Sequence, residues 1–175
     1  MELLYIAIGV VVLVLIFKLI VEPSIRYKKV YQMLLEVEKE GFIVRPCKDK
    51  SYDFTLENEN LLMFIKILAI PKNSCVTINS KYTWKLSWGG STHNKGRVYP
   101  NSRYLNEIVT FLKDELKENK PALKVILLYP DTEQVLRYLN ESELEVITSK
   151  KQPHGYKVVR FKSFVQEFAD IINIK

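Results

Sequence analysis

The stretch YDFTLENENLLMFIKILAI, residues 52–70, decides the expected fold because it holds two strand-like runs around a short polar turn. The runs Tyr52–Glu57 and Leu61–Ile70 are rich in aromatic and branched residues, which favour the pleated surface of a sheet. Between them, Asn58-Glu59-Asn60 has the residue types that turns prefer. The stretch therefore predicts a β-hairpin.

The register of this hairpin is predicted by the residues that must share its buried face. The register that brings apolar residues together places Asp53 opposite Phe64, with Lys66 two residues further along on the same side. Because alternate residues of a strand share a face, we expect an acid and a lysine on one face of the hairpin. The apolar pairs of this register are Phe54 with Met63 and Leu56 with Leu61.

A helix is predicted before the hairpin. Pro23 is expected to break an apolar N-terminal helix, after which Ser24 can cap a second helix that ends at Gly41. Phe42-Ile43-Val44 is expected to form a first short strand. The apolar positions of the second helix recur at helical spacing and are Tyr27, Val30, Tyr31, Leu34 and Val37.

The segment after the hairpin alternates apolar and polar residues from Val76 to Trp88. This period of two predicts a half-buried strand or hairpin, turning at Asn79-Ser80-Lys81. A loop over Gly89–Pro100 then leads to a long predicted helix, capped by Asn101 or Ser102 and stopped by Pro121. The apolar face of that helix is expected to hold Leu105, Ile108, Val109, Leu112 and Leu116.

The C-terminal part begins with the continuous apolar run Leu123–Tyr129, which is typical of a central strand covered on both faces. A capping-box pattern at Asp131 and Gln134 predicts a short helix through Leu139. Further strands are expected at Glu145–Ile147 and Tyr156–Phe161, and a last helix after Ser163. The order of elements predicts an α/β fold (mixed α+β) with a sheet flanked by helices.

The N-terminus predicts one transmembrane anchor. Leu3–Val21 contains a single charged residue, Lys18, and is about as long as the roughly 20 residues that cross a hydrocarbon core. A cleaved signal peptide would have a basic start and a small-residue cleavage site, whereas this chain has Glu2 and leaves the run through Val21-Glu22-Pro23. A buried core helix would have a polar face, which this run lacks. We therefore expect an anchor at 1–23 and a folded domain at 24–175.

The flanks of the anchor predict its orientation. No lysine or arginine precedes the run, and Arg26, Lys28 and Lys29 follow it, so the C-terminal domain is expected on the cytoplasmic side. The two cysteines, Cys47 and Cys75, agree with a reducing compartment, where both would stay thiols.

The net charge of +6 lies in the domain, which is compatible with nucleic acid or anionic lipid as a partner, or with an ordinary solvated surface. The loop Gly89–Arg97 is glycine-rich and basic, but it lacks the Gly-Lys-Ser/Thr of a P-loop. His93 and His154 lack the spacing of zinc ligands. Two tryptophans on one strand face are either core residues, which we favour, or stacking platforms for bases. The candidate phosphate contacts are Lys81, Lys85, Lys95 and Arg97, and the tryptophans are Trp84 and Trp88.

The chain resembles the restriction-endonuclease-like superfamily over roughly residues 27–172. The resemblance lies in a helix, then Gly41-Phe42-Ile43-Val44, then Asp53, then an apolar run into Lys66. An N-terminal membrane helix, a tryptophan-bearing strand, an Asn/Pro loop at Pro100-Asn101-Ser102 and a buried strand at 125–130 are similar to its nuclease-related (NERD) branch. The resemblance implies a central mixed sheet flanked by helices.

The resemblance also implies roles for individual residues. Asp53 would be a metal ligand and Lys66 the catalytic lysine of a Mg²⁺-dependent nuclease, in which two carboxylates hold the metal and the metal activates water. The chain departs from the pattern two residues before the lysine, where Phe64 replaces the second acid. Carboxylates that could compensate are Glu38, Glu40, Glu57 and Glu59.

Two functions follow as hypotheses. The departure at Phe64 favours a non-catalytic relative that binds nucleic acid or a protein partner beside the membrane and needs no cofactor. The alternative is an active nuclease that uses Mg²⁺. In the non-catalytic case Asp53 is a hydrogen-bonded strand residue and Lys66 is its salt-bridge partner.

Overall fold

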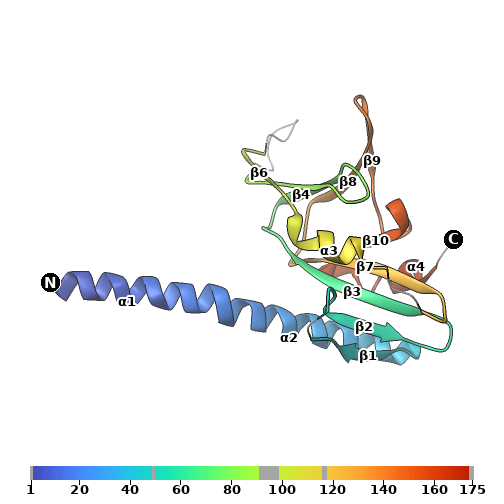
Figure 1. The fold of residues 1–175 in the computed structure, drawn as a ribbon, viewed down its shortest axis with the longest axis horizontal. Coiled ribbons are helices and arrows are strands. Elements are labelled where there is room, and N and C mark those ends of the chain that lie inside the picture. The colour runs from blue at the N-terminus through green and yellow to red at the C-terminus, as the bar shows by residue number, and fades with distance from the viewer. Residues whose placement is uncertain (1, 49, 91–98, 116–117, 174–175) are drawn as a thin grey trace.

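The structure is a computed structural model that describes residues 2–48, 50–90, 99–115 and 118–173. A long N-terminal helix projects from a folded domain (Figure 1). Its helical segments follow one another without a break: α1 (Glu2–Ile16), η1 (Phe17–Val21), α2 (Glu22–Leu35) and η2 (Glu36–Glu40). The helix from Tyr5 to Glu40 is long and apolar enough to cross a membrane, and its most apolar window makes no buried contact with the domain.

The expected break at Pro23 is wrong. The turn before the proline is a π-helical one, in which the Glu22 N–H donates to the Phe17 carbonyl rather than to the residue four back. This wider turn makes room for the proline ring, which would clash in a regular α-helix. Ser24 is not a cap either, because its hydroxyl donates to the Ile20 carbonyl at 2.7 Å within the continuous helix. Gly41 does end the helix, in a left-handed conformation with φ of 82°.

The first sheet, sheet A, has five strands in the order β1-β2-β3-β7-β10. The pairs β1–β2 and β2–β3 are antiparallel, and β3–β7 and β7–β10 are parallel. The sheet is therefore mixed, and the predicted buried strand at 123–129 is confirmed at its interior. The bounds are β1 (Ile43–Pro46), β2 (Phe54–Glu57), β3 (Leu62–Ala69), β7 (Ala122–Tyr129) and β10 (Tyr156–Arg160).

The second sheet, sheet B, also has five strands, in the order β6-β5-β4-β8-β9. The predicted hairpin with a period of two is confirmed as β4 and β5, which pair antiparallel around a turn at 79–83. Sheet B was not expected as a separate layer. The bounds are β4 (Ser74–Ile78), β5 (Trp84–Trp88), β6 (Asn101–Tyr104), β8 (Gln134–Asn140) and β9 (Glu143–Val146).

Two predicted helices are wrong. Asn101–Tyr104 forms strand β6 against β5, so the long helix shrinks to η3 (Asn106–Ile108) and α3 (Val109–Lys113). The helix predicted from Asp131 through Leu139 is replaced by strand β8, which starts at Gln134 and pairs with both β4 and β9. In both places, hydrogen bonding with neighbouring strands outweighs the local preference for a capped helix. The remaining helical segments are η4 (Pro153–Gly155), η5 (Phe161–Ser163) and α4 (Phe168–Ile172).

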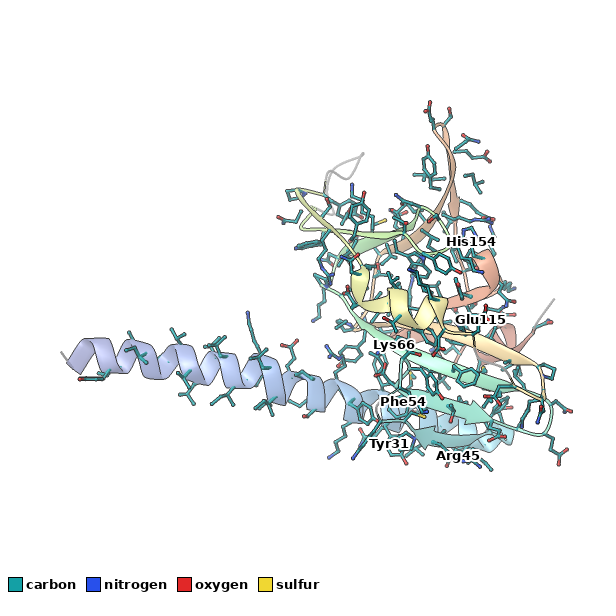
Figure 2. All side chains as sticks on the ribbon, in the orientation of Figure 1. Tyr31, Arg45, Phe54, Lys66, Glu115 and His154 are labelled. Atoms are coloured by element: carbon teal, nitrogen blue, oxygen red, sulfur yellow. The ribbon has the colours of Figure 1, made fainter. Side chains whose placement is uncertain are left out.

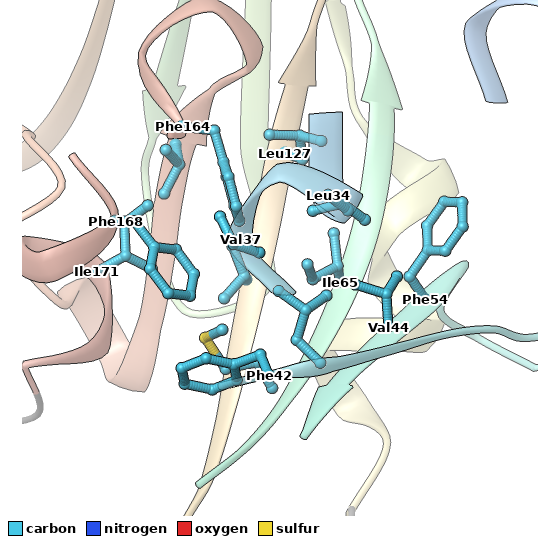
Figure 3. Close-up of a cluster of buried hydrophobic side chains, with 14 of the residues drawn as sticks. Leu34, Val37, Phe42, Val44, Phe54, Ile65, Leu127, Phe164, Phe168 and Ile171 are labelled. Carbon is cyan, nitrogen blue, oxygen red and sulfur yellow. The ribbon is translucent and has the colours of Figure 1, made fainter. Parts of the chain in front are cut away.

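Two apolar clusters hold the domain together, one on each face of sheet A. The first packs α2 and α4 against the sheet, and Leu34, Phe54 and Leu127 are among its fully buried residues (Figure 3). The second lies between sheet A, sheet B and α3, and contains Phe64 and Trp84. The domain is therefore layered as helices, sheet A, and then sheet B with α3.

A buried lysine ties the C-terminal segment to the domain. Lys157 on β10 is 1% exposed, and its ammonium donates to the carbonyls of Ser149 (2.8 Å) and Asp170 (3.0 Å), with longer bonds to two more carbonyls. Burial lowers the pKa of Lys157 because it disfavours the charged form, and Asp170 partly offsets this effect. The ammonium thus joins the turn after β9 to the end of α4.

The Lys157→Met substitution is expected to lower the free energy of unfolding by about 2 kcal/mol, because buried carbonyls lose their donor while the apolar volume is kept. Denaturant unfolding of the full chain in detergent, followed by circular dichroism, measures this. Lys72→Met, at an exposed lysine, is the control and should change stability by less than about 0.5 kcal/mol. Equal effects of the two substitutions would show that the Lys157 bonds contribute nothing.

Candidate functional site

Asp53 and Lys66 lie on one face of the hairpin, as the sequence predicts. The Asp53 carboxylate is 3.3 Å from the Lys66 ammonium, and both side chains are about three-quarters buried. The same carboxylate accepts a 2.7 Å hydrogen bond from the backbone N–H of Ile67. Asp53, the residue just before β2, therefore binds the backbone of β3 at Ile67, and the Lys66 ammonium neutralises the charge of its carboxylate.

The predicted register is wrong by two residues. Thr55, not Asp53, lies opposite Phe64, and Leu56 pairs with Met63. The turn decides this, because the side-chain oxygen of Asn58 accepts the N–H groups of Asn60 and Leu61 and so tightens the bend. A shift of two residues keeps every side chain on its predicted face, which explains why the pairing of Asp53 with Lys66 survives the error.

Phe64 is part of the core. It is 1% exposed and packs edge-on against Tyr52, with ring centroids 4.8 Å apart. Its partner on β7 is Lys124, whose ammonium donates to the carbonyls of Phe111 (2.7 Å), Leu112 and Asp114 at the end of α3. Burial lowers the pKa of Lys124, Asp114 opposes that shift, and Lys81 adds to it. A phenyl ring therefore occupies position 64, and a cation lies beside it on β7.

The four glutamates that the sequence offers as replacements for the second carboxylate have other partners or exposed positions. Glu57 pairs with Lys120 and Arg45, and these partners, with the Lys120 hydrogen bond foremost, lower its pKa. It also lies four residues from Asp53 along the chain, roughly 13 Å in an extended strand. Glu38 and Glu40 are on η2, and Glu59 is at the tip of the turn, all exposed. Across the described ranges, no group of three or more His, Cys, Asp or Glu side chains could hold a metal ion.

The candidate phosphate contacts are not brought together. Lys81 lies in the β4–β5 turn with its ammonium 5.4 Å from the centre of the Tyr82 ring. Lys85 alternates with the buried Trp84 and Leu86, so it lies on the outer face of sheet B. Lys95 and Arg97 are outside the described residues, as is His93. Trp84 is 1% exposed and Trp88 is half-buried against the same cluster, so the core interpretation holds for Trp84.

A cleft that the sequence did not predict opens beside Phe64. It has a volume of about 280 Å³, and its walls come from the β4–β5 turn, the end of α3, β7 and η4. His154 in this cleft has an unusual φ of 54°, and its pKa is lowered by burial first and then by Arg137 and Lys81. In Figure 2, Glu115 and His154 lie on the sheet B side of β3, opposite Tyr31 and Phe54. The charged residues of the cleft are Lys81, Lys113, Lys124, Asp114 and Glu115.

The sequence and the fold were compared with those of known proteins. The chain matches no family model, no curated protein and no solved structure.

The contacts of Asp53 predict a structural role that can be measured. Asp53→Ala should lower the free energy of unfolding by about 1–2 kcal/mol, because the Ile67 N–H loses a charged acceptor in a partly buried place. Lys66→Met should cost less, about 0–1 kcal/mol, since the ion pair is partly solvated. Denaturant unfolding of the full chain in detergent compares the two.

Asp53→Asn is the matched control, because its amide oxygen can still accept the Ile67 N–H, and its cost should fall between the other two. If Asp53→Ala leaves the stability of the chain unchanged, then the carboxylate is not held for structural reasons.

Proposed function

We propose that this protein is a membrane-anchored, nuclease-like domain that has lost catalysis and binds nucleic acid at the cytoplasmic face of the membrane. The proposed loss of catalysis rests on the contacts of the Asp53 carboxylate. It already accepts a hydrogen bond from the Ile67 N–H and forms an ion pair with the Lys66 ammonium. The family resemblance itself is supported by the placement of these two residues on one face of adjacent antiparallel strands within a mixed sheet.

A magnesium ion does not fit the residues at this site. Mg²⁺ sheds water reluctantly and needs carboxylate ligands in near-octahedral positions. The site offers one carboxylate that already has two partners, and the ammonium groups of Lys66 and Lys124 oppose a second cation. Phe64 offers no ligand atom. No step of phosphodiester hydrolysis is therefore assigned to these side chains.

Nucleic acid as the partner is supported by charge. The chain carries a net charge of +6, and the cleft beside Phe64 presents Lys81 and Lys113 at its mouth. Exposed lysines bind phosphates without reading sequence, so such binding weakens steeply as salt rises. A protein partner at the membrane is the second candidate. It is favoured if the purified chain forms no complex with any oligonucleotide.

The membrane location rests on the apolar helix, and the orientation rests on the charges that follow it. Lys28 and Lys29 are exposed on α2 immediately after the apolar segment, and Arg26 is half-buried beside them. Basic residues next to a span are retained on the cytoplasmic side.

We expect the purified full chain in detergent to bind labelled oligonucleotides in a salt-dependent manner without cleaving them. Cleavage of DNA or RNA with Mg²⁺ or Mn²⁺ should not exceed that in EDTA, because the site lacks a second carboxylate. Metal-dependent cleavage that disappears in both Asp53→Ala and Lys66→Ala would contradict the proposal. In that event Phe64→Glu, with Phe64→Leu as the packing control, tests whether position 64 limits metal binding.

A protease added outside intact cells that express the full chain should leave the 24–175 domain whole. The same protease should digest it after the membrane is permeabilised, since the basic flank holds the domain inside. Immunoblotting against a C-terminal tag measures both. Digestion in intact cells would reverse the proposed orientation.

A further inference from the structure

Two lysines from distant parts of the chain converge on one exposed aromatic ring. Lys81 comes from the β4–β5 turn and Lys113 from the last turn of α3, and their ammonium groups are 5.4 and 5.9 Å from the centre of the Tyr82 ring. Both lysines are exposed, and Tyr82 is 39% exposed. Within the described part of the chain, neither lysine forms an ion pair with a carboxylate. Like charges that converge in this way favour an anion between them.

The cleft behind these lysines adds to the positive potential. Lys81, Lys124 and His154 all line the cleft, so three nitrogen-bearing side chains face the same space. The Lys124 ammonium is held by three backbone carbonyls, so it contributes charge to the cleft without moving. Of the two acids, Asp114 accepts a hydrogen bond from Ser51 at 2.7 Å. The anion-attracting side of the cleft is therefore the side with Lys81 and Lys113.

The histidine of the cleft is held in a backbone conformation that non-glycine residues rarely adopt. His154 has φ of 54°, and Gly155 follows with φ of 85°. The turn is kept in place by Gln152, which accepts the Gly155 N–H through its carbonyl and donates to the Gly155 carbonyl through its side chain. Backbone strain of this kind is concentrated at ligand-binding sites. It places the imidazole among the walls of the cleft rather than leaving it on an open turn.

We propose that this cleft binds a nucleoside monophosphate, with the phosphate between Lys81 and Lys113 and the base against Tyr82. The volume of about 280 Å³ is at the small end of ligand sites, which suits one nucleotide rather than a larger ligand. An exposed tyrosine ring offers a stacking surface to any base. The Glu115 carboxylate also lines the cleft and can accept hydrogen bonds from hydroxyl or amino groups of the ligand. The cleft shares Lys81 and Lys113 with the proposed nucleic-acid contact, so this inference deepens the proposed function, whereas neither Asp53 nor Lys66 lines the cleft.

The test uses the full chain in nanodiscs of phosphatidylcholine, with calorimetric titration of AMP, adenosine, inorganic phosphate and sn-glycerol 3-phosphate. AMP should bind most tightly, and Lys81→Ala and Lys113→Ala should each weaken it about tenfold, as expected for a lost charged hydrogen bond. Lys72→Ala, at an exposed lysine that does not line the cleft, is the matched control and should leave AMP binding within twofold. Tyr82→Ala should weaken AMP while leaving the affinity for inorganic phosphate unchanged.

A second readout reports the cleft directly. The chain has two histidines, so in a His93→Asn background the only imidazole is that of His154. Saturating AMP should raise the pKa of His154 followed by NMR, because an anion favours the charged imidazole. The proposal is overturned if AMP does not bind, if Lys72→Ala weakens AMP binding as much as Lys81→Ala does, or if the His154 pKa stays unchanged. Equal or tighter binding of sn-glycerol 3-phosphate overturns it in favour of a lipid headgroup.

Discussion

The structure depends on the parallel pairing of β3 with β7, which runs over eight residue pairs from Leu62–Ala122 to Ala69–Tyr129. Both strands are buried on both faces, so their alternate residues pack into the two apolar clusters on opposite sides of sheet A. From β3, Met63 and Ile65 face the helices, while Phe64 faces sheet B. Phe64 and Lys124 are cross-strand partners in this ladder. The same strand pairing therefore positions the buried core residues and the residues of the candidate site.

Several of the lysines serve the fold rather than a partner. Lys124 and Lys157 donate to backbone carbonyls at the ends of segments, and Lys120 bonds to Glu57 and to the Asn58 carbonyl. A buried ammonium is costly unless it is fully hydrogen-bonded, and these contacts supply the bonds. The net charge of the chain therefore overstates the charge that is free to meet an anion. The lysines at the mouth of the cleft matter more for binding than the total does.

The apolar N-terminal helix and the domain are joined by packing as well as by the chain. The Tyr27 and Tyr31 rings on α2 stack on Phe54 of β2, with centroid distances of 4.6 and 5.9 Å. Aromatic stacking of this kind adds roughly 0.5–1.5 kcal/mol per pair beyond area burial. Since the helix is continuous from the apolar segment into α2, strand β2, next to Asp53, packs against the same helix that carries the apolar segment (Figure 1).

The sequence by itself determined the apolar span, the end of its helix at Gly41, the hairpins, the central strand and the shared face of Asp53 and Lys66. These features follow from local periodicity and from turn residues, which act within a few residues. Only the tertiary structure decided that 101–104 and 134–140 are strands, because their pairing partners lie elsewhere in the chain. It also decided the exact hairpin register, through the Asn58 side chain, and the cleft, where Lys81, Lys113 and His154 meet. Contacts between residues so far apart leave no periodic signal in the sequence, since they depend on how the layers pack.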